Sequence, residues 1–212
     1  MPQKIEALDD LLGEQKVIPV IVVEDVDGAV PLARALVEGG LPMIEITLRT
    51  PAALGAIRAI AGEVPGARVG AGTILTARQF GEATEAGAQF IVSPGVTREI
   101  LATASQSPVP LLPGAITPSE VMAAREEGYT FLKFFPASAA GGAPFLKSLA
   151  SPFGGIRFCP TGGIGPDDAL DYLSLPNVRC VGGSWVTPSD KVRSGDWDAV
   201  AALAREAAAI AA

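Results

Sequence analysis

The sequence predicts a single (β/α)8 TIM barrel with an additional N-terminal helix. Three observations support this fold class. Short apolar runs of β character recur eight times, segments of helical apolar periodicity separate them, and explicit cap signals open several of these helices. Regular alternation of strands and helices implies parallel strands joined by crossover helices. Eight such units in 212 residues fit a small barrel better than an open doubly wound sheet.

The predicted elements follow one another along the whole chain. Residues Met1–Leu12 have the charged, amphipathic pattern of a helix. The expected strands are Val17–Val23, Met43–Leu48, Arg68–Thr73, Gln89–Ser93, Val109–Leu112, Thr130–Phe135, Ile156–Thr161 and Val178–Gly182. The expected helices are Ala29–Glu38, Ala52–Ile60, Ala77–Ala86, Arg98–Ala104, Pro118–Glu127, Asp167–Leu173 and a final alanine-rich helix from about Trp197 to Ala211.

Capping residues mark three helix starts. Thr117-Pro118-Ser119-Glu120 combines an N-cap, a proline at the first helical position and a capping-box acid. Thr76 to Gln79 forms a second box, and Thr50-Pro51 indicates a third start. These threonines therefore need no functional explanation.

Composition narrows the function classes. We expect one domain over residues 1–212, because no segment resembles a linker. No apolar run approaches the roughly 20 residues of a membrane span, and no signal peptide is evident. The net charge of −7 argues against nucleic acid and anionic membranes as partners. Cys159 and Cys180 fall in expected buried strands, which suggests reduced thiols and a cytoplasmic location.

The chain contains no histidine. Ser-His-Asp and Cys-His catalysis and histidine-containing zinc sites are therefore excluded. Asp167 and Asp168 follow Pro166 in an expected first helical turn, where acidic residues favour the helix dipole, so we interpret them as structural. Metal catalysis at an all-carboxylate site remains open from the residues alone.

Lys133 is the most informative residue. It stands alone among Phe131, Leu132, Phe134 and Phe135 in an expected buried strand. Desolvation disfavours the ammonium form, so this amine is expected to be neutral often enough to act as a nucleophile. Two structural alternatives remain open: the side chain extends out of the strand end, or it pairs with a buried carboxylate.

The second strand carries polar side chains on one face. Glu45, Thr47 and Arg49 alternate with Ile44, Ile46 and Leu48, so the polar set is expected to point into the barrel. Glu45 is a candidate for proton transfer, and Arg49 for binding a substrate carboxylate. A structural Glu45–Arg49 ion pair is a compatible alternative. We expect Arg157 and Arg179 to face the helix layer or solvent.

Paired glycines end the last two strands. Thr161-Gly162-Gly163 and Gly182-Gly183-Ser184 place flexible backbone at the strand ends, where TIM barrels often bind phosphate. Either pair alone would be a weak signal, but the barrel requires both at these positions. Thr73, at the end of the third strand, is a candidate ligand or a cap residue.

With these residues in view, the chain resembles the 2-dehydro-3-deoxy-phosphogluconate (KDPG) aldolase family, which overlaps with 4-hydroxy-2-oxoglutarate aldolases. The resemblance spans nearly the whole chain. It is carried by Ile44-Glu45-Ile46-Thr47-Leu48-Arg49, Gly70-Ala71-Gly72-Thr73, Leu132-Lys133-Phe134-Phe135-Pro136-Ala137 and Cys159-Pro160-Thr161-Gly162-Gly163-Ile164.

The resemblance implies a metal-independent class I aldolase, a carbon–carbon lyase that is usually a homotrimer. It therefore predicts no metal and no cofactor. It implies the following roles. Lys133 forms the Schiff base, Glu45 is the general acid and base, Arg49 and Thr73 hold the pyruvate-like carboxylate, Thr161 lines the site, and Gly162, Gly163, Gly183 and Ser184 bind phosphate.

The expected reaction is reversible cleavage of 2-dehydro-3-deoxy-6-phospho-D-gluconate to pyruvate and glyceraldehyde 3-phosphate. Two other substrates remain open, 4-hydroxy-2-oxoglutarate and the 6-phosphogalactonate epimer, because the pyruvate half is common to all three. A barrel that only binds sugar phosphates, or an isomerase, is a rival from another class. Neither would explain Lys133 as a nucleophile.

Overall fold

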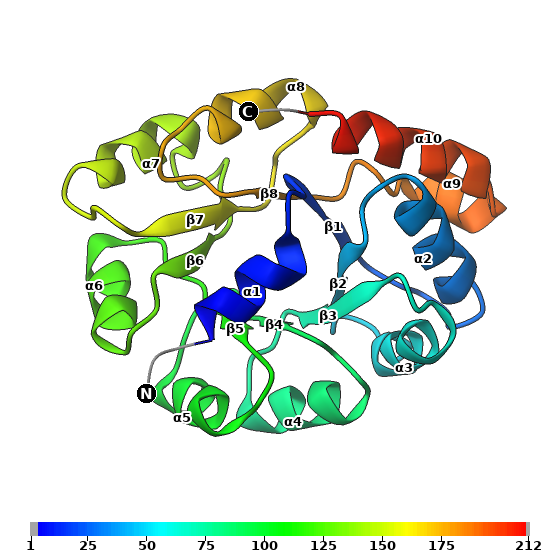
Figure 1. Cartoon of the computed structure of the whole chain (residues 1–212), viewed down its shortest axis with the longest axis horizontal. Coiled ribbons are helices and arrows are strands. Elements are labelled where there is room, and N and C mark those ends of the chain that lie inside the picture. The colour runs from blue at the N-terminus through cyan, green and yellow to red at the C-terminus, as the bar shows by residue number, and fades with distance from the viewer. Residues whose placement is uncertain (1–3, 211–212) are drawn as a thin grey trace.

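A ring of eight parallel strands forms the centre of the computed structural model, which describes residues 4–210 (Figure 1). The strands are β1 (Val17–Ile21), β2 (Met43–Thr47), β3 (Arg68–Gly72), β4 (Ile91–Val92), β5 (Leu111–Leu112), β6 (Phe131–Phe134), β7 (Arg157–Pro160) and β8 (Val181–Gly183). Six strands pair in the order β5-β4-β3-β2-β1-β8, and β6 pairs with β7. Bridges from Gly114 to Lys133 and from Thr161 to Gly182 join these two sheets. The predicted barrel is confirmed.

Helices surround the ring on its outer side, except for the first, which lies across one end of the ring (Figure 1). They are α1 (Ile5–Leu12), α2 (Ala29–Glu38), α3 (Ala53–Glu63), α4 (Ala77–Glu85), α5 (Arg98–Gln106), α6 (Pro118–Glu126), α7 (Gly142–Ala150), α8 (Pro166–Leu173), α9 (Ser189–Ser194) and α10 (Trp197–Ala208). The predicted beginning of the first helix, residues 1–3, and Ala211 lie outside the described residues. The sequence patterns did not reveal α7 or α9.

The predicted caps have mixed outcomes. Thr117 and Glu120 form the expected capping box of α6. The Thr76 side chain accepts a hydrogen bond from the Gln79 amide and caps α4, but the Gln79 side chain accepts from Leu75 instead. The prediction for Thr50 is wrong, because α3 begins at Ala53 and the Thr50 hydroxyl donates to the carbonyl of Val23.

Two apolar layers lie on opposite sides of the strand ring. The outer layer fills the space between strands and helices and includes Ile44 and Ile46, as the alternation on β2 predicts. The inner layer fills the barrel and includes Phe131 and Cys159. Leu8 of α1 belongs to this inner layer, so the N-terminal helix completes the barrel interior.

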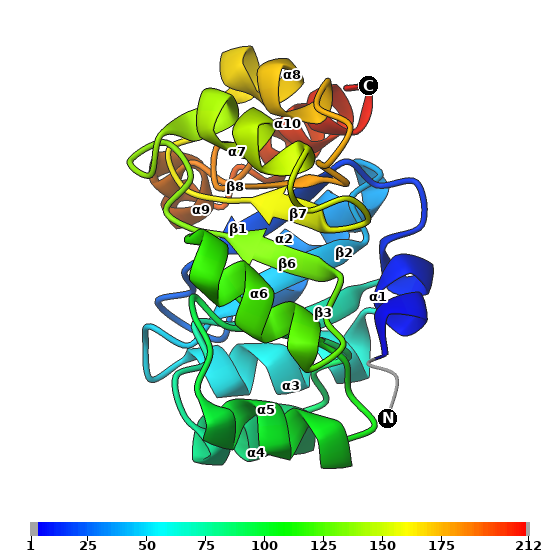
Figure 2. The same ribbon diagram turned by 90° about the vertical axis from the view of Figure 1, so that its left-hand side faces the viewer.

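Helix α1 lies across the N-terminal opening of the barrel, at the end opposite to α9 (Figure 2). Asp9 accepts two hydrogen bonds from Arg157, at 2.9 and 2.7 Å, and lies 3.7 Å from Arg179. The prediction that these arginines face the helix layer or solvent is therefore wrong. Arg157 begins β7 and Arg179 precedes β8 by two residues, so their side chains reach the helix that closes this opening.

Between residues 4 and 210, none of the helices has the length and apolar character needed to cross a membrane.

Candidate active site

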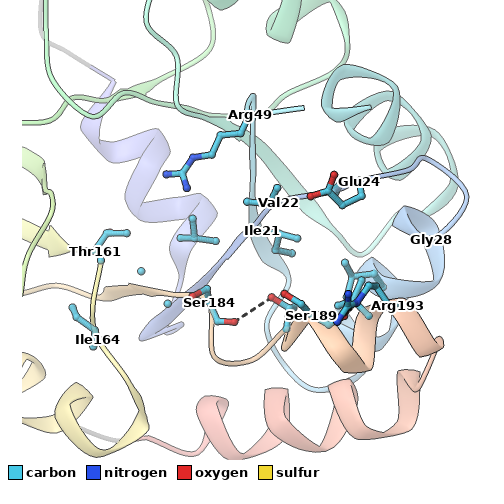
Figure 3. Close-up of a pocket in the computed structure, with 18 of the residues that line it drawn as sticks. Ile21, Val22, Glu24, Gly28, Arg49, Thr161, Ile164, Ser184, Ser189 and Arg193 are labelled. Carbon is cyan, nitrogen blue, oxygen red and sulfur yellow. Dashed lines mark hydrogen bonds between the residues drawn. The ribbon is translucent and has the colours of Figure 1, made fainter. Parts of the chain in front are cut away.

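A cavity of about 1020 Å³ opens at the C-terminal end of the barrel. Its walls come from the ends of β1, β6, β7 and β8, from the loop that follows β1, and from α9 (Figure 3). Parallel strands of a barrel direct their C-terminal ends to one face, and enzymes with this fold carry their sites there. This cavity is therefore the candidate active site.

Lys133 reaches the cavity from β6, and its side chain is buried with 6% exposure. Its Nζ lies 3.0 Å from Glu45 Oε1 and 3.4 Å from Oε2. The Phe135 ring lies beside the amine, with its centroid 5.5 Å away. The lysine is thus not isolated, as its apolar neighbours in the sequence suggested, but pairs with a carboxylate that is itself only 4% exposed.

The two residues of this pair come from opposite sides of the strand ring. In the order of strands, β3, β4 and β5 separate β2 from β6 on one side, and β1, β8 and β7 on the other. The contact between residues 88 positions apart therefore spans the barrel interior. A proton can pass directly between the two groups without a solvent molecule.

Arg49 and Thr73 form a second polar contact at the cavity. Arg49 follows β2 and extends into the cavity, with Thr161 and Ser184 on its other walls (Figure 3). Its Nε donates to the Thr73 hydroxyl at 3.3 Å. Thr73 has a φ of 58°, which is unusual for a β-branched residue and is typical of functional sites.

The glycine pairs occupy one wall of the cavity. Gly162 and Gly163 have φ values of 98° and 72°, which residues with a side chain rarely adopt. A Cβ at Gly183 would lie 1.7 Å from the Trp185 ring, and one at Gly182 would lie 2.4 Å from Thr161 Oγ1. No side chain fits at Gly182 or Gly183, so this wall consists of glycine backbone together with Ser184.

The structure brings most of the candidate residues to this one cavity. The candidates that line it are Arg49, Lys133, Thr161, Gly162, Gly163, Gly183 and Ser184. Glu45 is reached through Lys133, and Thr73 through Arg49. The possible Glu45–Arg49 ion pair is not formed, because Glu45 pairs with Lys133 instead.

Helix α9 adds cavity residues that the sequence analysis missed. Ser189 and Arg193 line the cavity, and the Arg193 Nε donates to the Ser189 carbonyl at 3.1 Å. The sequence does contain a signal for the start of this helix, because Pro188 follows Thr187 and the acidic Asp190 comes two residues later. A short extra helix after the eighth strand is also common in TIM barrels that bind phosphate.

Other titratable groups near the site have structural roles. Asp168 accepts a hydrogen bond from the Gly165 amide at the start of α8, as expected from its position. Burial is the main cause that holds the pKa of the Cys180 thiol well above its ordinary value, and the neighbouring Cys159 is the next. Both cysteines are free thiols.

In the described part of the chain, no group of three or more acidic, cysteine or histidine residues is arranged to hold a metal ion.

Comparison with known proteins agrees with this geometry. Residues 8–203 match the aldolase family described as KDPG and KHG aldolase. A 2-dehydro-3-deoxy-phosphogluconate aldolase of Pseudoalteromonas atlantica is 51% identical over 96% of this chain and 94% of its own length.

Two solved structures superpose on nearly the whole fold. A KDPG aldolase of Legionella pneumophila, captured with pyruvate as a covalent carbinolamine intermediate, has a TM-score of 0.91 at 43% identity and covers 94% of this chain and 97% of its own. A 2-keto-3-deoxy-6-phosphogluconate aldolase of Zymomonas mobilis with 3-phosphoglycerate has a TM-score of 0.91 at 48% identity and covers 96% of each chain. With a family match over most of its length and such close relatives, this chain belongs to the KDPG and KHG aldolase family.

Proposed function

We propose that this protein is a class I aldolase that reversibly cleaves 2-dehydro-3-deoxy-6-phospho-D-gluconate to pyruvate and glyceraldehyde 3-phosphate. The observation that carries the proposal is the buried contact of 3.0 Å between Lys133 Nζ and Glu45 Oε1 at a cavity large enough for the substrate. It combines a nucleophilic amine with a group that can exchange protons with it.

We assign the carboxylate end of the substrate to Arg49 and the phosphate end to the glycine wall. Arg49 presents a planar guanidinium that can bind the carboxylate beside the ketone, and Thr73 orients it through the 3.3 Å hydrogen bond. The phosphate is assigned to Gly162, Gly163, Gly183 and Ser184, where backbone amides can approach an anion closely. Thr161, next to Gly162 in the chain, lines the cavity. The 3-phosphoglycerate complex of the Zymomonas relative supports a phosphate ligand.

The first half of the reaction forms the Schiff base. Glu45 takes a proton from the Lys133 ammonium, and the neutral amine attacks the C2 ketone to give a carbinolamine. Glu45 returns the proton to the C2 hydroxyl, which leaves as water, and a protonated imine remains. The covalent carbinolamine with pyruvate in the Legionella relative supports this step.

The second half breaks the carbon–carbon bond. The carboxylate of Glu45 removes the C4 hydroxyl proton while the C3–C4 bonding pair moves into the imine, which produces glyceraldehyde 3-phosphate and an enamine. Glu45 then returns that proton to C3. Water hydrolyses the imine, releases pyruvate and restores Lys133. One carboxylate therefore serves every proton transfer in a site without histidine.

Substitution of the two central residues tests this mechanism. Lys133→Ala is expected to reduce aldol cleavage to background, because no other amine replaces the nucleophile. Glu45→Gln is expected to lower kcat on the order of 10²- to 10⁴-fold, the usual range for lost acid–base catalysis. Borohydride reduction with pyruvate, followed by mass spectrometry, should give an adduct on Lys133 in the wild-type protein and a slower one in Glu45→Gln.

Two outcomes would contradict the proposal. Near-normal cleavage by Lys133→Ala would exclude the Schiff base, and a wild-type protein without an adduct would favour a binding module or an isomerase. EDTA is expected to leave turnover unchanged, because the protonated imine itself withdraws the electrons.

A second candidate substrate is 4-hydroxy-2-oxoglutarate, which the family description includes as KHG. The 6-phosphogalactonate epimer is a further candidate, since it shares the pyruvate half. Comparison of kcat/KM for the three acids decides between them. We expect the phosphorylated gluconate derivative to be cleaved fastest, because the glycine wall can bind its phosphate. Faster cleavage of the unphosphorylated acid would reassign the substrate.

Three further features remain proposals. A homotrimer follows from the family resemblance, and light scattering tests it through the mass of the native particle. A cytoplasmic location is supported by two free, buried cysteines, which are typical of reducing compartments. A single domain over residues 1–212 is supported by the continuous barrel within the described part of the chain.

A further inference from the structure

Gly72 of β3 leaves a space that the Glu45 carboxylate fills. A Cβ at Gly72 would lie 2.0 Å from Glu45 Oε1, 2.6 Å from Cδ and 2.7 Å from Cγ, whereas ordinary contacts begin at 3.4 Å. In the strand register Glu45 pairs with Gly70, and Gly72 pairs with Thr47. The Glu45 side chain therefore leans two positions along β3, toward the C-terminal end of the barrel and Lys133.

Backbone conformation does not explain this glycine. Gly162 and Gly163 have positive φ values that favour glycine, but Gly72 has none and continues a regular parallel strand. Any small residue could adopt its backbone conformation. What a side chain at this position lacks is room, and the atoms that occupy the room belong to Glu45.

A side chain at position 72 would displace the carboxylate that contacts Lys133. Glu45 is buried, so the displaced carboxylate could not move into solvent. Its 3.0 Å contact with Nζ depends on the present rotamer. An error of about 1 Å in the placement of a catalytic group can reduce turnover on the order of 100-fold.

We propose that Gly72 is a positioning residue, whose missing side chain seats the Glu45 carboxylate against Lys133 for proton transfer. The inference rests on the proposed aldolase mechanism and extends it to a residue that touches neither substrate nor product. Gly182 offers a parallel case on β8, because a Cβ there would lie 2.4 Å from Thr161 Oγ1.

Gly72→Ala tests this proposal, with Gly70→Ala as the matched control. Both positions lie on the same strand and face, but a Cβ at Gly70 would meet the Phe90 ring at 2.4 Å instead of Glu45. We expect Gly72→Ala to lower kcat on the order of 100-fold with little change in KM. The Lys133 adduct with pyruvate should still form. Gly70→Ala should lower the melting temperature without this selective loss of kcat.

A double-mutant cycle with Glu45→Ala separates positioning from general damage to β3. Alanine removes the Cγ, Cδ and Oε1 atoms that a Cβ at position 72 would meet, so it leaves room for that Cβ. We expect Gly72→Ala to cost on the order of 100-fold in the wild-type background. In the Glu45→Ala background it should change the residual kcat by no more than about threefold, as for uncoupled sites.

The outcomes distinguish this inference from the proposed function. If the wild-type protein neither cleaves substrate nor forms the adduct, the proposed function fails. If the wild-type protein is active and Gly72→Ala keeps its kcat, or loses it equally in both backgrounds, only the role of Gly72 fails. If Gly72→Ala does not fold, the double variant decides: folding with the residual turnover of Glu45→Ala supports positioning, and failure to fold contradicts it.

Discussion

The pairing of Lys133 with Glu45 gives the site its chemical character. Two charged groups removed from water cost more free energy than their attraction commonly returns, so a buried ion pair contributes little to stability. Both side chains are at most 6% exposed. A gain in stability therefore does not account for the pair, and the apolar neighbours of Lys133 in the sequence describe only half of its surroundings.

Tyr129 shows a different consequence of burial. Its hydroxyl has no hydrogen-bond partner among residues 4–210, and desolvation, together with the charge of Glu127, raises the pKa of Tyr129 to about 12. The folded state thus binds the phenol proton more tightly than the unfolded state, whose pKa is 10.0. This contribution to stability is complete below pH 10 and is lost as the pH rises toward 12.

We expect Tyr129→Phe to be at least as stable as the wild-type protein at pH 7, because a buried unpaired hydroxyl costs about 1–3 kcal/mol. Between pH 10 and 12 its melting temperature should fall less than that of the wild-type protein. Thermal unfolding followed by circular dichroism across this range measures both effects. A clear loss of stability at pH 7 would mean that the hydroxyl has a partner after all.

At the scale of the elements, helix α1 closes the barrel on the side away from the cavity. Leu8 and Leu12 pack into the inner apolar layer, while Asp9 contacts Arg157 at the start of β7 and Arg179 just before β8. Arg68 adds a hydrogen bond to the carbonyl of Leu11 at 2.6 Å. Apolar packing inside the ring and hydrogen bonds at its rim hold the helix in place.

Leu12→Ala is expected to lower the free energy of unfolding by about 2–5 kcal/mol, because Leu12 is only 1% exposed. Leu170→Ala is the matched control, since that side chain on α8 is 52% exposed and its loss should cost within about 0.5 kcal/mol. Urea unfolding measures the difference. Equal losses in the two variants would show that α1 does not complete the core.

At the scale of the whole molecule, the two ends of the barrel divide stability from chemistry. The N-terminal end carries α1, on the side opposite to α9 (Figure 2), and there Asp9 contacts Arg157 and Arg179. The C-terminal end carries the cavity with Lys133. This division is general for TIM barrels, in which residues at the C-terminal strand ends carry the catalytic function. It explains why the candidate residues come from many strands and still meet in one cavity.

Much of this organisation follows from local sequence patterns. Strand alternation placed Glu45 inside the barrel and Ile44 and Ile46 outside, and the paired glycines marked the wall formed by β7 and β8. These features depend on neighbours within a few residues, which a sequence displays directly. Helix α7 was not predicted, because Gly142 and Pro144 at its start are typical of a loop.

The sequence alone determined the order of strands and helices, the buried lysine and the residue types at the strand ends, because periodicity and capping are local properties. Only the tertiary structure decided that Lys133 meets Glu45, that Gly72 makes room for that carboxylate, that Arg193 reaches the cavity and that α1 binds Arg157. Each of these contacts joins elements that are separate in the sequence and that only the closed ring of strands brings together. The spacing of residues along the chain does not encode that geometry.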